Sequence, residues 1–128
     1  MIAICIDPAR VHEFWPYVSE RIKRAIDRVG ISDFRSIEAS VLDGRALLWV
    51  AVENYKVCAA AVTQLVGGVC EIVACGGEDL NGFLPLLTDL EQYAKNEECK
   101  SMRLIGRKGW LRVLKNYKQK AVVIERLF

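Results

Sequence analysis

Apolar residues recur at helical spacing over the first quarter of the chain. The segment 1–6 is rich in isoleucine, which is typical of a strand, and Asp7-Pro8 has the composition of a helix start. Apolar side chains then return every three or four residues, at Val11, Trp15, Val18, Ile22, Ile26 and Val29. This period predicts one long helix that faces a core and ends at Gly30. We expect Pro16 to divide a short first turn from the main helix, because proline removes a backbone N–H.

The period shortens from helical to strand-like at residue 46. Before that point a second, short helix is expected, capped by Ser32 and ended by Gly44, with its apolar residues at Phe34, Ile37 and Val41. Segments 46–53 and 57–66 have the composition of strands. Gly67-Gly68 is a two-residue hairpin signal that leads into a further strand at 69–75. Three consecutive antiparallel strands are therefore predicted.

The second half of the chain alternates between helix and strand. We expect a helix at 80–96, a strand at 101–106, a helix at 110–117 and a last strand at 122–127. Strands 69–75 and 101–106 should be parallel neighbours at the centre of the sheet, because the helix between them forms a crossover. The predicted order is β-α-α-β-β-β-α-β-α-β. This order describes one α/β domain over residues 1–128, with a mixed, mostly antiparallel sheet of about six strands and helices on both faces.

Composition narrows the class of protein. The chain has 128 residues, of which 52% are hydrophobic and 27% charged, as expected of a single folded domain. The sequence has no apolar run of roughly 18–20 residues, so no membrane association is expected. The five cysteines form no CxxC pair and His12 is the only histidine. We therefore expect reduced thiols in a cytoplasmic setting and no metal site.

Charge divides the chain into two unequal parts. Residues 1–99 hold nine basic and 15 acidic side chains, a balance of −6, whereas residues 100–128 hold nine basic and one acidic, a balance of +8. The basic residues could be the solvated faces of ordinary elements. Alternatively, they form an electropositive face for a phosphate-bearing ligand, an acidic protein or a nucleic acid. The sequence contains no nucleic-acid recognition motif, so the last of these is the weakest.

The element order resembles the GNAT (Gcn5-related N-acetyltransferase) fold over essentially the whole chain. The stretches that carry the resemblance are GRALLWV at 44–50, IVACGG at 72–77 and GRKGW at 106–110, and they are most similar to small GNAT-like proteins of phages and prophages. The resemblance implies that acetyl-CoA, if bound, lies between the two parallel strands. Its diphosphate would then lie at Gly76, Gly77, Asn81 and Gly82.

The glycine turn at 76–82 departs from the pattern of that family. The family's Arg/Gln-x-x-Gly-x-Gly/Ala loop is replaced by GGEDLNG. Glu78 and Asp79 fall where a helix dipole favours anions, so they could occupy the place of a diphosphate. A plain glycine turn with acidic capping is the alternative.

Two catalytic positions of the family have matches in this chain. Glu71 corresponds to a glutamate that acts as general base, directly or through water, and Tyr117 to a tyrosine that protonates the departing thiolate. Glu71 could equally be a solvent-facing strand residue, and Tyr117 an aromatic anchor of a helix end. Trp110 stands where the family has an asparagine, and the Gly-Phe pair after the tyrosine is missing.

The loop at 106–110 places two cations and an indole at the end of a strand. Arginine and tryptophan are typical of binding hot spots, so we predict a partner-binding surface at Arg107, Lys108, Trp110 and Arg112. The sequence thus favours a GNAT-like protein of phage or prophage origin that has lost its acyl-CoA site and needs no cofactor. It would bind a protein partner or a second copy of itself, as a component of the phage particle or of its assembly. Its location would be the phage particle or the host cytoplasm. An acyl-CoA-dependent N-acyltransferase is the alternative.

Overall fold

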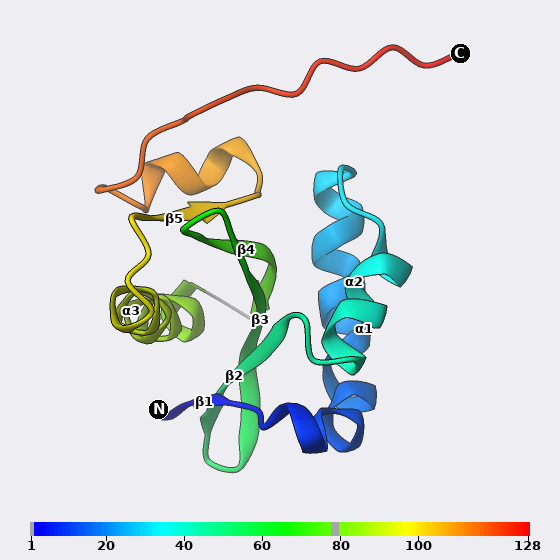
Figure 1. Cartoon of the computed structure of the whole chain (residues 1–128), viewed down its shortest axis with the longest axis vertical. Coiled ribbons are helices and arrows are strands. Elements are labelled where there is room, and N and C mark those ends of the chain that lie inside the picture. Colours follow the sequence, from blue (N-terminus) through cyan, green and yellow to red (C-terminus); the bar gives the residue numbers. More distant parts are fainter. Residues whose placement is uncertain (1, 78–79) are drawn as a thin grey trace.

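One mixed sheet forms the centre of the molecule (Figure 1). The structure is a computed structural model that describes residues 2–77 and 80–128. The strands are adjacent in chain order, and all neighbours are antiparallel except the last pair, which is parallel. They are β1 (Ile2–Cys5), β2 (Leu47–Glu53), β3 (Lys56–Val66), β4 (Val69–Gly77) and β5 (Ser101–Leu104). The α/β class and the mostly antiparallel sheet are confirmed.

Helices cover both faces of this sheet, as predicted. Helices α1 (Val11–Val29) and α2 (Phe34–Leu42) lie on one face and α3 (Leu80–Asn96) on the other (Figure 1). Two short 3-10 helices, η1 (Pro8–Arg10) and η2 (Lys108–Arg112), precede α1 and follow β5. The core therefore has two layers, one between α1 and the sheet and one between α3 and the sheet.

Helix α1 has the predicted apolar face and one unpredicted feature. Its buried residues are those of the sequence pattern except Val29, which is half-buried, and Gly30 ends the helix in the left-handed conformation. Pro16, however, lies inside the continuous helix and does not divide it. The proline is on the exposed side, where water can bind the carbonyl that lacks its N–H donor. The cap of α2 is also one residue later than predicted, because Asp33, not Ser32, accepts the N–H of Ser36, at 3.0 Å.

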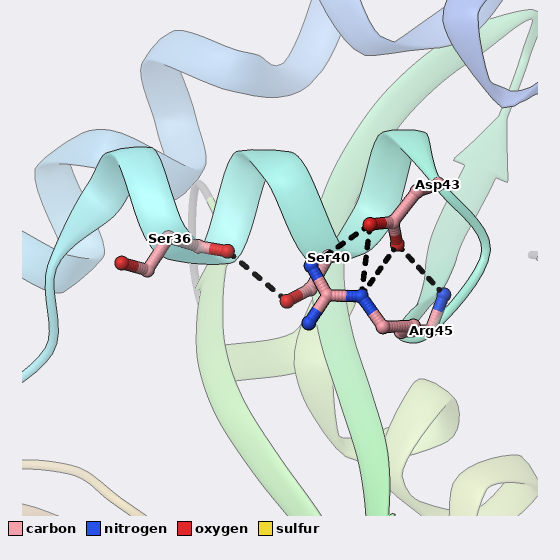
Figure 2. Close-up of polar contacts among 4 residues, drawn as sticks. All are labelled: Ser36, Ser40, Asp43 and Arg45. Carbon is pink, nitrogen blue, oxygen red and sulfur yellow. Dashed lines mark hydrogen bonds and ion pairs between the residues drawn. The ribbon is translucent and has the colours of Figure 1, made fainter.

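The turn from α2 into β2 is fixed by a carboxylate. Figure 2 shows the Asp43 side chain bound to both the backbone N–H and the guanidinium of Arg45, with the Nε–Oδ2 distance at 2.8 Å. Gly44 between them has a φ of 83°, which an L side chain rarely adopts. Within α2 the hydroxyl of Ser40 donates to the carbonyl of Ser36 (Figure 2). The contacts between Asp43 and Arg45 therefore stabilise the turn that leads into β2.

A bulge in β4 separates this strand from β5. Thr63 of β3 pairs with Ile72 and Val62 pairs with Ala74, so Val73 is an extra residue in the ladder. As a result Val73 and Ala74 both pack in the α1-side core, while Ile72 packs in the α3-side core. β5 pairs with β4 only as far as Ile72. Because a bulge bends its strand and increases the local twist, β4 turns away from β5 just where pairing stops.

Three predictions about the second half of the chain are corrected. β4 and β5 are parallel neighbours, but β5 is the edge strand of the described sheet instead of a central one. The predicted strand at 122–127 is extended chain that pairs with no other described segment and passes η2 away from the sheet (Figure 1). The predicted helix at 110–117 is a 3-10 helix followed by tight turns, since so short a segment gains too few bonds to offset helix nucleation.

The buried hydrogen bond between Trp49 and Thr63 gives a first test of the core. The indole Nε1 donates to the threonine hydroxyl at 3.0 Å, and Thr63 is 1% exposed. Thr63→Val leaves the indole N–H without an acceptor, so the free energy of unfolding should fall by about 1–3 kcal/mol in chemical denaturation. The control is Thr88→Val on the exposed face of α3, which should change it by less than about 0.5 kcal/mol. Equal effects of the two substitutions would contradict this account of the core.

Candidate active-site cleft

The separation of β4 and β5 opens a cleft at the end of the sheet. The cleft has a volume of about 470 Å³, within the range of small-molecule sites. Its walls are the second half of α1, the end of β4 from Val73 to Gly77, and the chain that follows β5 from Ile105 to Arg107. The bulge thus creates the cleft, because without it the two parallel strands could continue side by side.

Arginines give this cleft a positive charge. Arg21, Arg24 and Arg28 of α1 line it together with Arg107, and the described lining contains no aspartate or glutamate. Arg21 is tied to the sheet, since its Nη1 donates to the carbonyl of Val57 at 3.1 Å. Four cations around a partly enclosed space attract an anion more strongly than the same charges would in open water.

The division of the chain into an acidic part and a basic part did not reveal the three arginines of α1. They belong to residues 1–99, whose balance is −6. Their spacing of three and four residues places all three on one face of the helix. That spacing is visible in the sequence and could have identified this face.

Gly76 allows α1 to lie close against the end of β4. A Cβ at this position would come within 3.3 Å of the Arg21 carbonyl oxygen and 3.2 Å of its Cγ. Gly76 and Gly77 both line the cleft, where the predicted diphosphate loop begins. Of the other predicted loop residues, Glu78 and Asp79 lie outside the described residues. Asn81 and Gly82 fall in the first turn of α3, and their side chains are not described either.

An aromatic pair closes the α3 side of the cleft. The rings of Phe83 and Trp110 lie 4.8 Å apart between centroids, and both residues line the cleft. Trp110 also packs against the α3-side core. This residue, predicted to bind a partner from a surface loop, therefore has a packing role that the sequence did not indicate.

The other members of the predicted partner-binding surface lie around η2. Arg107 and Arg112 line a second, more open hollow beside Trp110, and Lys108 is exposed. The structure thus brings Arg107, Trp110 and Arg112 together. Of these three, Arg107 and Trp110 belong to the cleft as well.

Glu71 has partners outside the described cleft lining. Its carboxylate accepts a hydrogen bond from Gln64 Nε2 at 3.0 Å and pairs with Arg103 Nη1 at 3.3 Å. It lies two residues before the bulged Val73, in the part of β4 that still pairs with β5. Glu71 is therefore held by Gln64 and Arg103 and is not among the described residues that line the cleft.

Tyr117 connects the chain after η2 to helix α3. Its hydroxyl donates to Glu91 Oε2 at 2.8 Å. Burial and this carboxylate raise the pKa of Tyr117 above its ordinary value, so the phenol stays protonated at neutral pH. Like Glu71, it is not among the described lining residues.

Cys75 is the thiol of the cleft. Burial raises its pKa to about 12, so it is a neutral thiol at neutral pH and a weak nucleophile. The described lining also has no histidine, so no nucleophile–base pair is present there. Across the described residues no group of His, Cys, Asp and Glu side chains could hold a metal ion, and no helix could span a membrane.

Solved structures of acetyltransferases share this fold. The chain matches a "predicted acetyltransferase" of Clostridium acetobutylicum, solved with acetyl-CoA, with a TM-score of 0.69, 15% identity and coverage of 98% of this chain and 95% of the other. An aminoglycoside acetyltransferase from an uncultured soil metagenomic sample, solved with sisomicin, matches with a TM-score of 0.69 and 11% identity. The match covers 99% of this chain and 95% of the other. A GNAT family acetyltransferase of Staphylococcus aureus matches with a TM-score of 0.62 and 12% identity. The match covers 99% of this chain and 98% of the other.

These likenesses establish the fold of the chain. It is the GNAT fold, as the sequence predicted. No protein-family model and no curated protein sequence matches the chain. The similarity to phage-encoded proteins remains a prediction.

Gly106 provides a test of the cleft's aromatic wall. A Cβ on this residue would lie 2.8 Å from Trp110 Cδ1, so Gly106→Ala must displace the indole from Phe83. We expect a loss of about 1–3 kcal/mol in the free energy of unfolding and a change in tryptophan fluorescence. Gly109→Ala is the matched control, because a Cβ there meets no atom within 4 Å. If Gly106→Ala behaves like the control, Trp110 is not seated as described.

Proposed function

We propose that the protein is an acyl-CoA-dependent N-acyltransferase. The observation that carries this proposal is the cleft where the parallel strands β4 and β5 separate, with Gly76, Gly77 and Arg107 in its lining. The shared fold supports it, because the similar structures are described as acetyltransferases and one of them was solved with acetyl-CoA. The sequence favoured macromolecular binding, with N-acyl transfer as the alternative. The cleft and the shared fold support the alternative.

The residues of the cleft fit a diphosphate-bearing cofactor. Gly76 and Gly77 present backbone without side chains, and Arg107 supplies a cation at the opposite wall. These residues would hold acyl-CoA, which supplies an acyl group activated as a thioester. A neutral lining of the same size would offer nothing to the phosphates, whereas hydrogen bonds between charged groups are among the stronger polar contacts.

Within this proposal the protein supplies backbone polar groups beside the thioester and side chains for proton transfer. Val73 pairs with no residue of β3, so the bulge leaves backbone polar groups beside the cleft. A backbone N–H so placed can donate to a carbonyl oxygen as negative charge develops on it. The described lining has no base, so the proton of the acceptor amine leaves through water, with Glu71 as the proposed base and the protonated Tyr117 as the proposed acid.

Calorimetric titration with acetyl-CoA tests the proposal. We expect saturable binding, weakened roughly 10-fold or more by Arg107→Gln, since a charged hydrogen bond contributes about 1.5–3 kcal/mol. Lys108→Gln is the matched control, because this neighbouring cation is outside the cleft lining. An absence of binding at millimolar acetyl-CoA would refute the enzyme assignment.

A second candidate function is self-association through the C-terminal segment, defined here as residues 119–128. Its apolar side chains are exposed: Val122, Val123, Ile124, Leu127 and Phe128. The outer edge of β5 pairs with no described strand. We propose that the C-terminal segment of one copy adds to β5 of a second copy, because an unpaired strand and an unpaired edge satisfy one another.

Light scattering after size-exclusion chromatography tests this second candidate. The wild type should form a dimer that dissociates on dilution. Val123→Pro, which removes an N–H from the strand, should give a monomer, whereas Gln119→Pro, before the apolar run, should remain dimeric. At a dilution where the wild type is a monomer, both variants should melt at the same temperature as the wild type, since the segment is exposed. A wild type that stays monomeric at every concentration would contradict the proposal.

A further inference from the structure

We infer that the α1 side of the cleft binds an acceptor amine that carries a negative charge, either a carboxylate or a phosphate. The inference rests on the proposed N-acyltransferase function and names the class of its second substrate. The acceptor is a small molecule, because its site is one side of a cleft of about 470 Å³ and not an extended surface.

The two substrates are expected on opposite faces of the sheet. Helices α1 and α3 lie on opposite faces (Figure 1). The glycine turn that would hold a diphosphate leads from β4 into α3, so the cofactor is expected on the α3 side. An amine must approach the thioester carbonyl from a free direction, and the arginine-lined face of α1 remains for it.

The basic residues of helix α1 differ in whether they form an ion pair within the helix. Lys23 forms an ion pair with Asp27 at 2.7 Å, and neither residue lines the cleft. Arg24 and Arg28 line the cleft and have no ion-pair partner within the described part of the chain. Their spacing of four residues places like charges side by side on the helix, an arrangement that disfavours the helix unless an anion lies between them.

The neighbourhood adds further charge and a hydroxyl group. Arg21 lies one turn before Arg24 on the same face, and Ser32 follows the end of the helix at the cleft wall. Guanidinium groups bind carboxylates and phosphates in a bidentate manner, which makes an arginine pair selective for planar or tetrahedral oxyanions. A neutral or cationic amine would supply no anion to Arg24 and Arg28.

Matched acceptor pairs test the inference. Acetyl transfer from acetyl-CoA is measured to O-phosphoethanolamine against ethanolamine, and to β-alanine against β-alaninamide. The anionic member of at least one pair should have the higher kcat/KM, by about 10- to 100-fold, which is the effect of one or two charged hydrogen bonds. The pair that shows the preference identifies phosphate or carboxylate as the recognised group.

The variant Arg24→Gln with Arg28→Gln separates acceptor binding from cofactor binding. The preference for the anionic member should fall toward unity, while the Kd for acetyl-CoA stays within about twofold. Lys23→Gln, on the same helix but outside the cleft lining, should leave both unchanged. In calorimetry without turnover, the preferred anionic amine should bind the CoA-saturated wild type and not the double variant.

The outcomes distinguish this inference from the proposed function. If acetyl-CoA binds but neither pair shows a preference, the inference is wrong and the acyltransferase proposal survives. If the double variant loses acetyl-CoA binding, Arg24 and Arg28 belong to the cofactor site and the inference is also wrong. If acetyl-CoA does not bind the wild type at all, both fail together.

Discussion

The bulge at Val73 is the constraint on which the cleft depends. One extra residue in β4 bends the strand away from β5 and ends the parallel pairing at Ile72. It also places two successive side chains, Val73 and Ala74, in the core beneath α1. The opening between the strands, and the packing that keeps it open, therefore share one cause.

The charged and aromatic side chains around this opening determine which ligands it suits. The long helix α1 buries one face in the core and presents arginines along the next face, where Gly76 lets the helix lie close to the end of β4. The walls are thus positive on the α1 side and aromatic on the α3 side, where Phe83 and Trp110 meet. The positive wall is suited to the anionic group of the proposed acceptor, and the aromatic wall to the acyl chain of the proposed cofactor.

Sequence reasoning predicted the fold well because periodicity reports burial directly. The stripe of α1, the hairpin glycines and the β4–α3–β5 crossover follow from local patterns. The bulge was not predicted, since it is a property of pairing between strands and leaves little trace in either one. The last strand failed for a related reason: 122–127 has the composition of a strand but no partner in the described chain.

The site was predicted less completely than the fold. Gly76, Gly77, Arg107 and Trp110 were singled out from the sequence, and all four line the cleft. The arginines of α1 were missed because they are distant in sequence from the glycine turn and belong to an acidic part of the chain. Glu71 and Tyr117 were chosen by analogy, and each is tied to a partner, Arg103 and Glu91, that only tertiary contact reveals.

Amide hydrogen exchange with and without acetyl-CoA tests the central claim most directly. If the separation of β4 and β5 is the cofactor site, acetyl-CoA should slow exchange at residues 73–77 and 105–110, on both sides of the opening, and leave β1 and the β2–β3 hairpin unchanged. Protection confined to other elements, or no protection at saturating acetyl-CoA, would contradict the account.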